Sequence, residues 1–109
     1  MHSVANDGRA VVHVAGQLDV AGAAPLRREL VRLADADVSD VLVDLTAVTF
    51  IDSTGVGVLV GGLKRFRGTG GRLELVVDDA RVLRVLRIAG LLRTFTIHAS
   101  VEQALAAEV

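Results

Sequence analysis

Cysteine, tryptophan and tyrosine are all missing from this 109-residue sequence, and phenylalanine occurs only three times. Without cysteine, the chain has no disulfide framework and no thiolate for catalysis or metal binding. With so few aromatic rings, we do not expect the base-stacking platforms of proteins that bind single-stranded nucleic acid. These absences argue against thiol chemistry and against that mode of nucleic acid binding.

The sequence also lacks a long hydrophobic run and an excess of charge. Its longest apolar stretch, Val56 to Leu63, contains glycine and is far shorter than the roughly 20 residues of a membrane-spanning helix. Its 12 basic and 13 acidic residues leave a net charge of −1, so no overall field attracts nucleic acid or an anionic membrane. The start, MHSVANDGRAVV, has no basic and apolar signal segment. We therefore expect a cytoplasmic protein that neither binds nucleic acid nor inserts into membranes.

The length suits one domain, residues 1–109, with a single hydrophobic core. Short apolar segments predict five strands, at His2 to Val4, Ala10 to Val14, Val41 to Leu45, Leu73 to Val77 and Thr94 to His98. Helical spacing and capping residues predict four helices: one after Asp19 with Pro25 near its first turn, Thr54 to Arg67, one from a cap at Asp78 to Gly90, and Val101 to about Glu108 after Ser100.

This order predicts an α/β fold with an N-terminal β-hairpin, a mostly parallel sheet of four to five strands, and about four helices packed on it. The hairpin turn is expected at Asn6-Asp7-Gly8, and the apolar segment Val41 to Leu45 is typical of a central strand. Functional loops of such folds lie beyond the carboxyl ends of the strands. We expect the loops after Val14, Leu45 and Val77 to meet there, close to 16–19 and 50–55.

Three motifs typical of enzymes and nucleotide-binding proteins are absent, because each lacks one required residue. A phosphate-binding loop would need lysine directly after Gly62, where leucine stands, and a dinucleotide fingerprint starting at Gly55 would need glycine in place of Val60. A nucleophile elbow around Ser53 would need glycine in place of Ile51. We expect neither an enzyme nor a nucleotide cofactor.

The three histidines, His2, His13 and His98, are far apart in the sequence and show no spacing typical of metal ligands. Without cysteine, a metal site would have to be assembled from distant residues. We therefore expect no metal and no other cofactor.

Phe50-Ile51-Asp52-Ser53-Thr54-Gly55 places polar residues between an apolar strand and an amphipathic helix. Ser, Asp and Thr are favoured helix caps, so one interpretation is capping and nothing more. The other interpretation is that this segment contacts a partner protein. Asp19 has two comparable interpretations. It either caps a loop or helix, or it reaches the edge of the sheet near Ser53, where it contacts a partner or orients the serine hydroxyl.

The helix after this segment carries glycine on the side that we predict to face outward. Its core stripe is predicted as Val56, Leu59, Val60, Leu63 and Phe66, and the opposite side as Gly57, Val58, Gly61, Gly62 and Arg65. Glycine inside an exposed helix costs about 0.5 to 1 kcal/mol relative to alanine, so something should approach this side closely. It is either a docking surface for another protein or the contact of another helix of the same domain.

Four features together resemble the STAS domain family, and within it the bacterial anti-sigma factor antagonists. They are Gly16-Gln17-Leu18-Asp19, where the family often carries glutamate in place of Gln17, then Val43-Asp44-Leu45, Asp52-Ser53-Thr54-Gly55 and the glycine-rich helix. The resemblance covers nearly the whole chain.

The resemblance implies a protein-binding switch, not an enzyme. An anti-sigma factor with serine kinase activity would bind the unphosphorylated chain and phosphorylate Ser53, which ends binding, and a serine phosphatase would reset the switch. The implied partner surface consists of Asp19, Asp52, Ser53, Thr54, Gly55, Gly57, Val58 and Gly61. The alternatives are an unphosphorylated STAS scaffold or transport-complex subunit, and a STAS domain that binds a small ligand or nucleotide at the carboxyl edge of the sheet.

Overall fold

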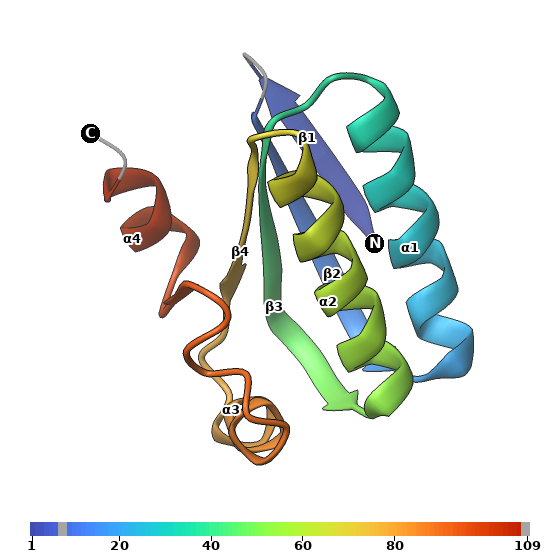
Figure 1. Ribbon diagram of the computed structural model, residues 1–109. Helices are drawn as coiled ribbons and strands as arrows, with labels where there is room; N and C mark the ends of the chain where they lie inside the picture. The colour runs from blue at the N-terminus through green and yellow to red at the C-terminus, as the bar shows by residue number, and fades with distance from the viewer. Residues whose placement is uncertain (7–8, 108–109) are drawn as a thin grey trace.

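The structure, a computed structural model, describes residues 1–6 and 9–107 (Figure 1). Its elements alternate after the initial hairpin as predicted. In chain order they are β1 His2–Asn6, β2 Arg9–Leu18, α1 Val20–Asp35, β3 Asp40–Ile51, α2 Ser53–Gly68, β4 Arg72–Val76, α3 Ala80–Ile88, β5 Ile97–His98 and α4 Val101–Ala106. The expected turn at Asp7-Gly8 and the expected helix end at Glu108 lie outside the described residues.

The five strands form one sheet in the order β1-β2-β3-β4-β5, with β3 at its centre. β1 is antiparallel to β2, and the other neighbours are parallel. Each parallel pair is joined through a helix, which such crossovers require. The predicted fold class and the central position of the strand containing 41–45 are confirmed.

The two faces of the sheet are covered to different extents. Helices α1 and α2 pack on one face of the sheet (Figure 1). Val12, Val43 and Leu75, which pair across β2, β3 and β4, are fully buried in the main core on that face. On the other face, α4 contributes Ala104 to a small cluster with Leu42 and Val76. Most of that second face carries no helix (Figure 1).

Strands β1, β2 and β3 are longer than predicted, and the extension of β2 and β3 moves the candidate site. The loop expected at 16–19 is mostly strand, because β2 runs on beside β3 as far as the pair Leu18 and Ile51. Register shifts after His13 and Gly16 allow this extension, and Gly16 has a φ of +84°. β4 pairs with β3 only up to Asp44, so the ends of β2 and β3 project past β4.

Three smaller predictions are wrong at the level of single residues. α3 is capped by Asp79 rather than Asp78, since the Asp79 carboxylate accepts the Arg81 N–H at 2.7 Å. The last strand begins at Ile97, because the chain before it turns to bury Phe95 in the core. Pro25 lies in the second turn of α1 rather than the first.

Candidate functional site

The carboxyl ends of β2 and β3 bring the starts of two helices together. Leu18 pairs with Ile51, and the N–H of Asp52 donates to the Leu18 carbonyl at 3.3 Å. α1 starts after Asp19 and α2 after Asp52, so both helices begin at this end of the molecule (Figure 1). We call Asp19, Val20, Phe50, Asp52 and Ser53 the helix-start site.

Both aspartates of the helix-start site cap helices. Oδ1 of Asp52 accepts the N–H of Thr54 at 2.9 Å and of Gly55 at 3.2 Å. Oδ1 of Asp19 accepts the N–H of Gly22 at 2.9 Å. The capping alternative is therefore confirmed for these two residues, and each carboxylate also places negative charge at a helix N-terminus, where it is stabilising.

Ser53 is the first residue of α2, and its side chain is exposed. Its hydroxyl makes no hydrogen bond to another described residue, because Asp52 already caps the helix. The interpretation of Ser53 as a cap is therefore wrong. The structure leaves Ser53 as an open hydroxyl at a helix start, while its neighbour Thr54 is half-buried.

The glycines of α2 fall into two sets. A Cβ at Gly57 or Gly61 would meet nothing within 4 Å. A Cβ at Gly62 would come within 2.8 Å of Leu30 in α1, and one at Gly55 would collide with the Leu18 carbonyl oxygen. The alternative of a contact with another helix of the domain is therefore confirmed for Gly62, whereas the docking surface at Gly57 and Gly61 stays a prediction.

The predicted outward side of α2 is wrong for Val58 and Gly62. Val58 is 4% exposed and belongs to the main core, and Gly62 is also buried. The reason is that α2 packs on α1 as well as on the sheet, which widens its buried arc. The predicted stripe allowed for only one contact direction.

Two exposed apolar side chains, not predicted as site residues, belong to the helix-start site. Val20 is 72% exposed at the first position of α1, and Phe50 is 49% exposed near the end of β3. Regular alternation from the buried Val48 would have turned Phe50 inward, but the register shift near Gly16 turns it outward. The sequence carries no local signal for the exposure of Phe50, because the register shift depends on the pairing of β2 with β3.

Asp44, a residue of the motif that carries the family resemblance, has a structural role on the second face of the sheet. Its carboxylate accepts the Thr46 N–H and hydroxyl at 3.0 and 2.8 Å and lies 2.7 Å from Nδ1 of His13, whose ring stacks on His2. Burial by itself raises the pKa of Asp44, but the hydrogen bonds from Thr46 and His13 outweigh it and lower the pKa. Asp44 thus holds β3 where it bends after its pairing with β4.

No cluster of three or more His, Cys, Asp or Glu able to hold a metal occurs in residues 1–6 and 9–107. Within the same ranges, none of the helices has the length and apolar character needed to cross a bilayer.

The family model described as "STAS domain" matches residues 2–104. Among curated proteins, the chain is similar to the anti-sigma-B factor antagonist of Bacillus subtilis (strain 168), at 38% identity over 97 residues. That match covers 89% of this chain and 88% of the relative. The resemblance seen in the sequence is thereby confirmed.

Among solved structures, an anti-sigma factor antagonist from Mycobacterium paratuberculosis matches with a TM-score of 0.88 and 25% identity, covering 97% of this chain and 90% of that one. The unphosphorylated form of SpoIIAA matches at 0.75 with 17% identity, over 96% and 92% of the two chains. Its phosphorylated form, from Bacillus, matches at 0.76 with 20% identity, over 97% and 96%. At these identities, SpoIIAA shows the same fold.

Proposed function

The chain belongs to the STAS domain family, and we propose that it is a cytoplasmic anti-sigma factor antagonist switched by phosphorylation of Ser53. The observation that carries the proposal is the exposed Ser53 hydroxyl, which has no role in capping α2. Curated relatives named for this function support it, since they match the chain over most of its length.

The partner surface that we propose follows one side of α2. Ser53, Gly57, Gly61 and Arg65 are spaced by four residues and are all exposed, so they form a line along the helix. The two open glycines leave the backbone without side-chain cover. A partner can therefore approach the helix axis closely directly beside the serine.

Val20 and Phe50 are the apolar anchors of this surface. Interfaces draw most of their binding energy from a few large side chains that become buried on association. They lie at the start of α1 and near the end of β3, the elements that meet at the helix-start site, and both are exposed in the free chain. Of the partner residues predicted from sequence, Asp19, Asp52, Thr54, Ser53, Gly57 and Gly61 stay in the proposal, whereas Gly55 and Val58 act only through packing.

Phosphorylation would end binding without unfolding the domain. The Ser53 hydroxyl attacks the γ-phosphorus of ATP on the kinase partner, ADP leaves, and the hydroxyl proton passes to a base of the kinase. The product carries about −1.5 to −2 charges at the start of α2, where the helix tolerates them. This chain supplies an acceptor hydroxyl and a docking surface and is a substrate, not a catalyst; hydrolysis of the phosphoserine by a phosphatase restores it.

The loss of affinity follows from repulsion at close range. Like charges about 4 Å apart repel by about 4 kcal/mol at an effective dielectric constant near 20. Asp52 and Asp19 already make this end acidic, so a partner that tolerates them is poorly placed to accept two further charges. The expected loss of affinity is on the order of a thousandfold.

Phosphate transfer tests the proposal directly. We would incubate the chain with the cognate anti-sigma factor and Mg-ATP, and measure the intact mass of wild type, Ser53→Ala and Thr54→Ala. One phosphate on the wild type and on Thr54→Ala, with none on Ser53→Ala, supports the proposal. A wild-type chain that binds the partner but gains no phosphate would favour an unphosphorylated scaffold instead.

A further inference from the structure

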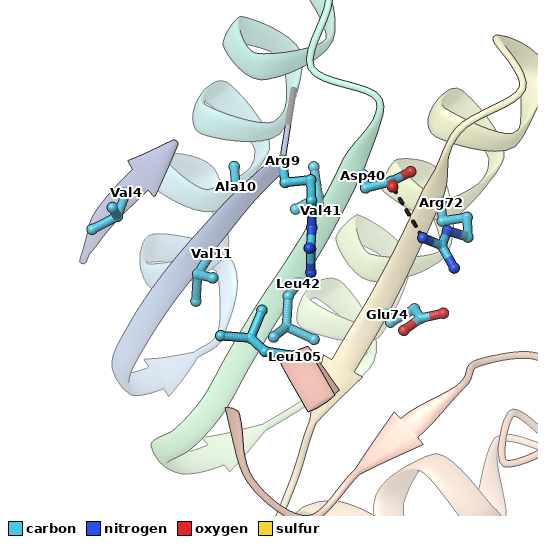
Figure 2. Close-up of a pocket in the computed structure, with 10 residues that line it drawn as sticks. All are labelled: Val4, Arg9, Ala10, Val11, Asp40, Val41, Leu42, Arg72, Glu74 and Leu105. Carbon is cyan, nitrogen blue, oxygen red and sulfur yellow. Dashed lines mark hydrogen bonds and ion pairs between the residues drawn. The ribbon is translucent and has the colours of Figure 1, made fainter. Parts of the chain in front are cut away.

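The second face of the sheet contains a hollow of about 320 Å³, which lies between β1 and α4 (Figure 2). This volume lies at the lower end of the range for pockets that bind small molecules. The first residues of β2, β3 and β4, namely Arg9, Asp40 and Arg72, line one end of it. The hollow is thus at the amino ends of the strands, at the opposite end of β2 and β3 from the helix-start site.

The floor and walls of the hollow are apolar. Val11 and Leu42 come from β2 and β3, and Val4 and Leu105 add walls from β1 and α4 (Figure 2). Val4 and Leu105 are among the exposed large hydrophobic side chains of the molecule. A ligand with a hydrocarbon portion would remove these side chains from water, which is favourable.

Two basic and two acidic side chains line the hollow: Arg9, Arg72, Asp40 and Glu74. Asp40 lies 3.0 Å from the guanidinium of Arg72, and Glu74 lies 2.8 Å from Nε2 of His98. The Arg72 guanidinium thus offsets the charge of Asp40, and the Glu74 carboxylate shares a hydrogen bond with the His98 ring. The side chain of Arg9 runs along the floor toward Leu42, with its nitrogens over the apolar surface (Figure 2).

We propose that the hollow binds a small anionic amphiphile. Its hydrocarbon portion lies on Val11 and Leu42 between Val4 and Leu105, and its carboxylate or phosphate head binds the Arg9 guanidinium. Arginine carries five N–H donors in a planar fork, so it can bind an oxyanion in addition to the interactions that it already makes.

This site is independent of the proposed switch and does not rest on it. The general rule for parallel sheets predicts a ligand at the carboxyl edge of the sheet, whereas the hollow lies at the amino ends of the strands. A ligand there would contact neither Ser53 nor the exposed side of α2. The two sites can therefore be occupied together.

The test uses decanoate, below its micelle concentration, as the probe, with decanol and decyltrimethylammonium as matched ligands. Binding is followed by NMR chemical-shift changes in the full chain and by titration calorimetry. Decanoate should perturb Val4, Val11, Leu42 and Leu105, and decanol should bind more weakly by on the order of tenfold. The cationic probe should bind more weakly still.

Two variants and one control locate the head and the wall. Arg9→Met keeps the apolar stem, and should weaken decanoate on the order of tenfold while leaving decanol unchanged. Leu105→Glu, at an exposed position of α4, should abolish decanoate binding even if Arg9→Met alters the strand. Arg27→Met, on the exposed side of α1, should change nothing.

Two results would overturn the proposal. One is absence of decanoate binding to a folded wild-type chain. The other is equal binding of decanoate and decanol, unaffected by Arg9→Met, since the guanidinium would then play no part. A phosphate-headed probe, decyl phosphate, separates the two possible head groups: tighter binding than decanoate assigns the site to phosphates, and weaker binding to carboxylates.

Discussion

The two sides of α2 carry the same residue type for opposite reasons. Gly55 and Gly62 face the interior, where a Cβ would strike the Leu18 carbonyl or the Leu30 side chain. Gly57 and Gly61 face solvent, where a Cβ would meet nothing. The inner pair is required by the fold and the outer pair is not, which supports the partner surface that we propose along the outer pair.

The same contrast separates neighbouring polar residues. Asp52 is committed to capping α2, whereas Ser53, the next residue, has an exposed hydroxyl that the fold does not use. Substitutions at groups that the fold uses, such as Asp52 and Gly55, should therefore alter stability. Substitutions at groups that the fold does not use, such as Ser53 and Gly61, should alter partner binding.

The largest effect on stability is expected for Gly55→Ala. The added methyl group collides with backbone, which cannot move as a side chain can, so the change should destabilise the domain by about 2 to 3 kcal/mol. Urea unfolding measures this. An unchanged midpoint would remove the distinction between inner and outer glycines.

Asp44→Asn extends the comparison to the second face of the sheet. It should lower the free energy of unfolding by about 1 to 3 kcal/mol at neutral pH, because buried charge-assisted hydrogen bonds are lost. The folded-state pKa of Asp44 lies below its ordinary value of 3.8, so its contribution is complete above that pH and is lost as the pH falls through the lowered pKa. Unfolding curves of wild type and variant should converge in strong acid. A gap that persists there would contradict the role of the charge, and Asp78→Asn, at an exposed residue, is the control.

Asp52→Ala and Ser53→Ala compare the residue that caps α2 with its neighbour, which does not. Loss of the Asp52 cap should lower the free energy of unfolding by about 1 kcal/mol, whereas Ser53→Ala should leave it nearly unchanged. Thermal unfolding of the two single variants decides this. Equal losses would mean that Ser53 also stabilises the helix start.

The smallest effect is a gain. Gly57→Ala should stabilise the domain by about 0.5 to 1 kcal/mol, since alanine is the better helix former and the space is open.

Gly61→Arg should leave the domain folded but weaken partner binding, which a titration with the anti-sigma factor measures. Undiminished affinity in Gly61→Arg would place the interface elsewhere.

Much of the fold follows from local patterns in the sequence. Hydrophobic periodicity and capping residues locate the four helices of the described residues, and the alternation of strands and helices determines a mostly parallel sheet with the segment 41–45 at its centre. The segment 52–55 could likewise be assigned to a helix start, because its polar residues stand between an apolar strand and an amphipathic helix.

The missing parts depend on contacts between distant residues. The extension of β2 to Leu18 needs register shifts against β3, and no local pattern shows where they fall. The same shift exposes Phe50, and the packing of α1 on α2 buries Val58. The hollow at Arg9 is formed by residues of four strands and of α4, so the sequence alone could not locate it.

The central claim is that negative charge on Ser53 ejects a bound partner while the domain stays folded. It is tested most directly by measuring the affinity of Ser53→Asp and Ser53→Ala for the cognate anti-sigma factor under identical conditions, with thermal unfolding as the check on folding. The account predicts that Ser53→Ala binds like the wild type and that Ser53→Asp loses affinity on the order of a thousandfold with its unfolding temperature retained. Equal affinities of the two folded variants would contradict it.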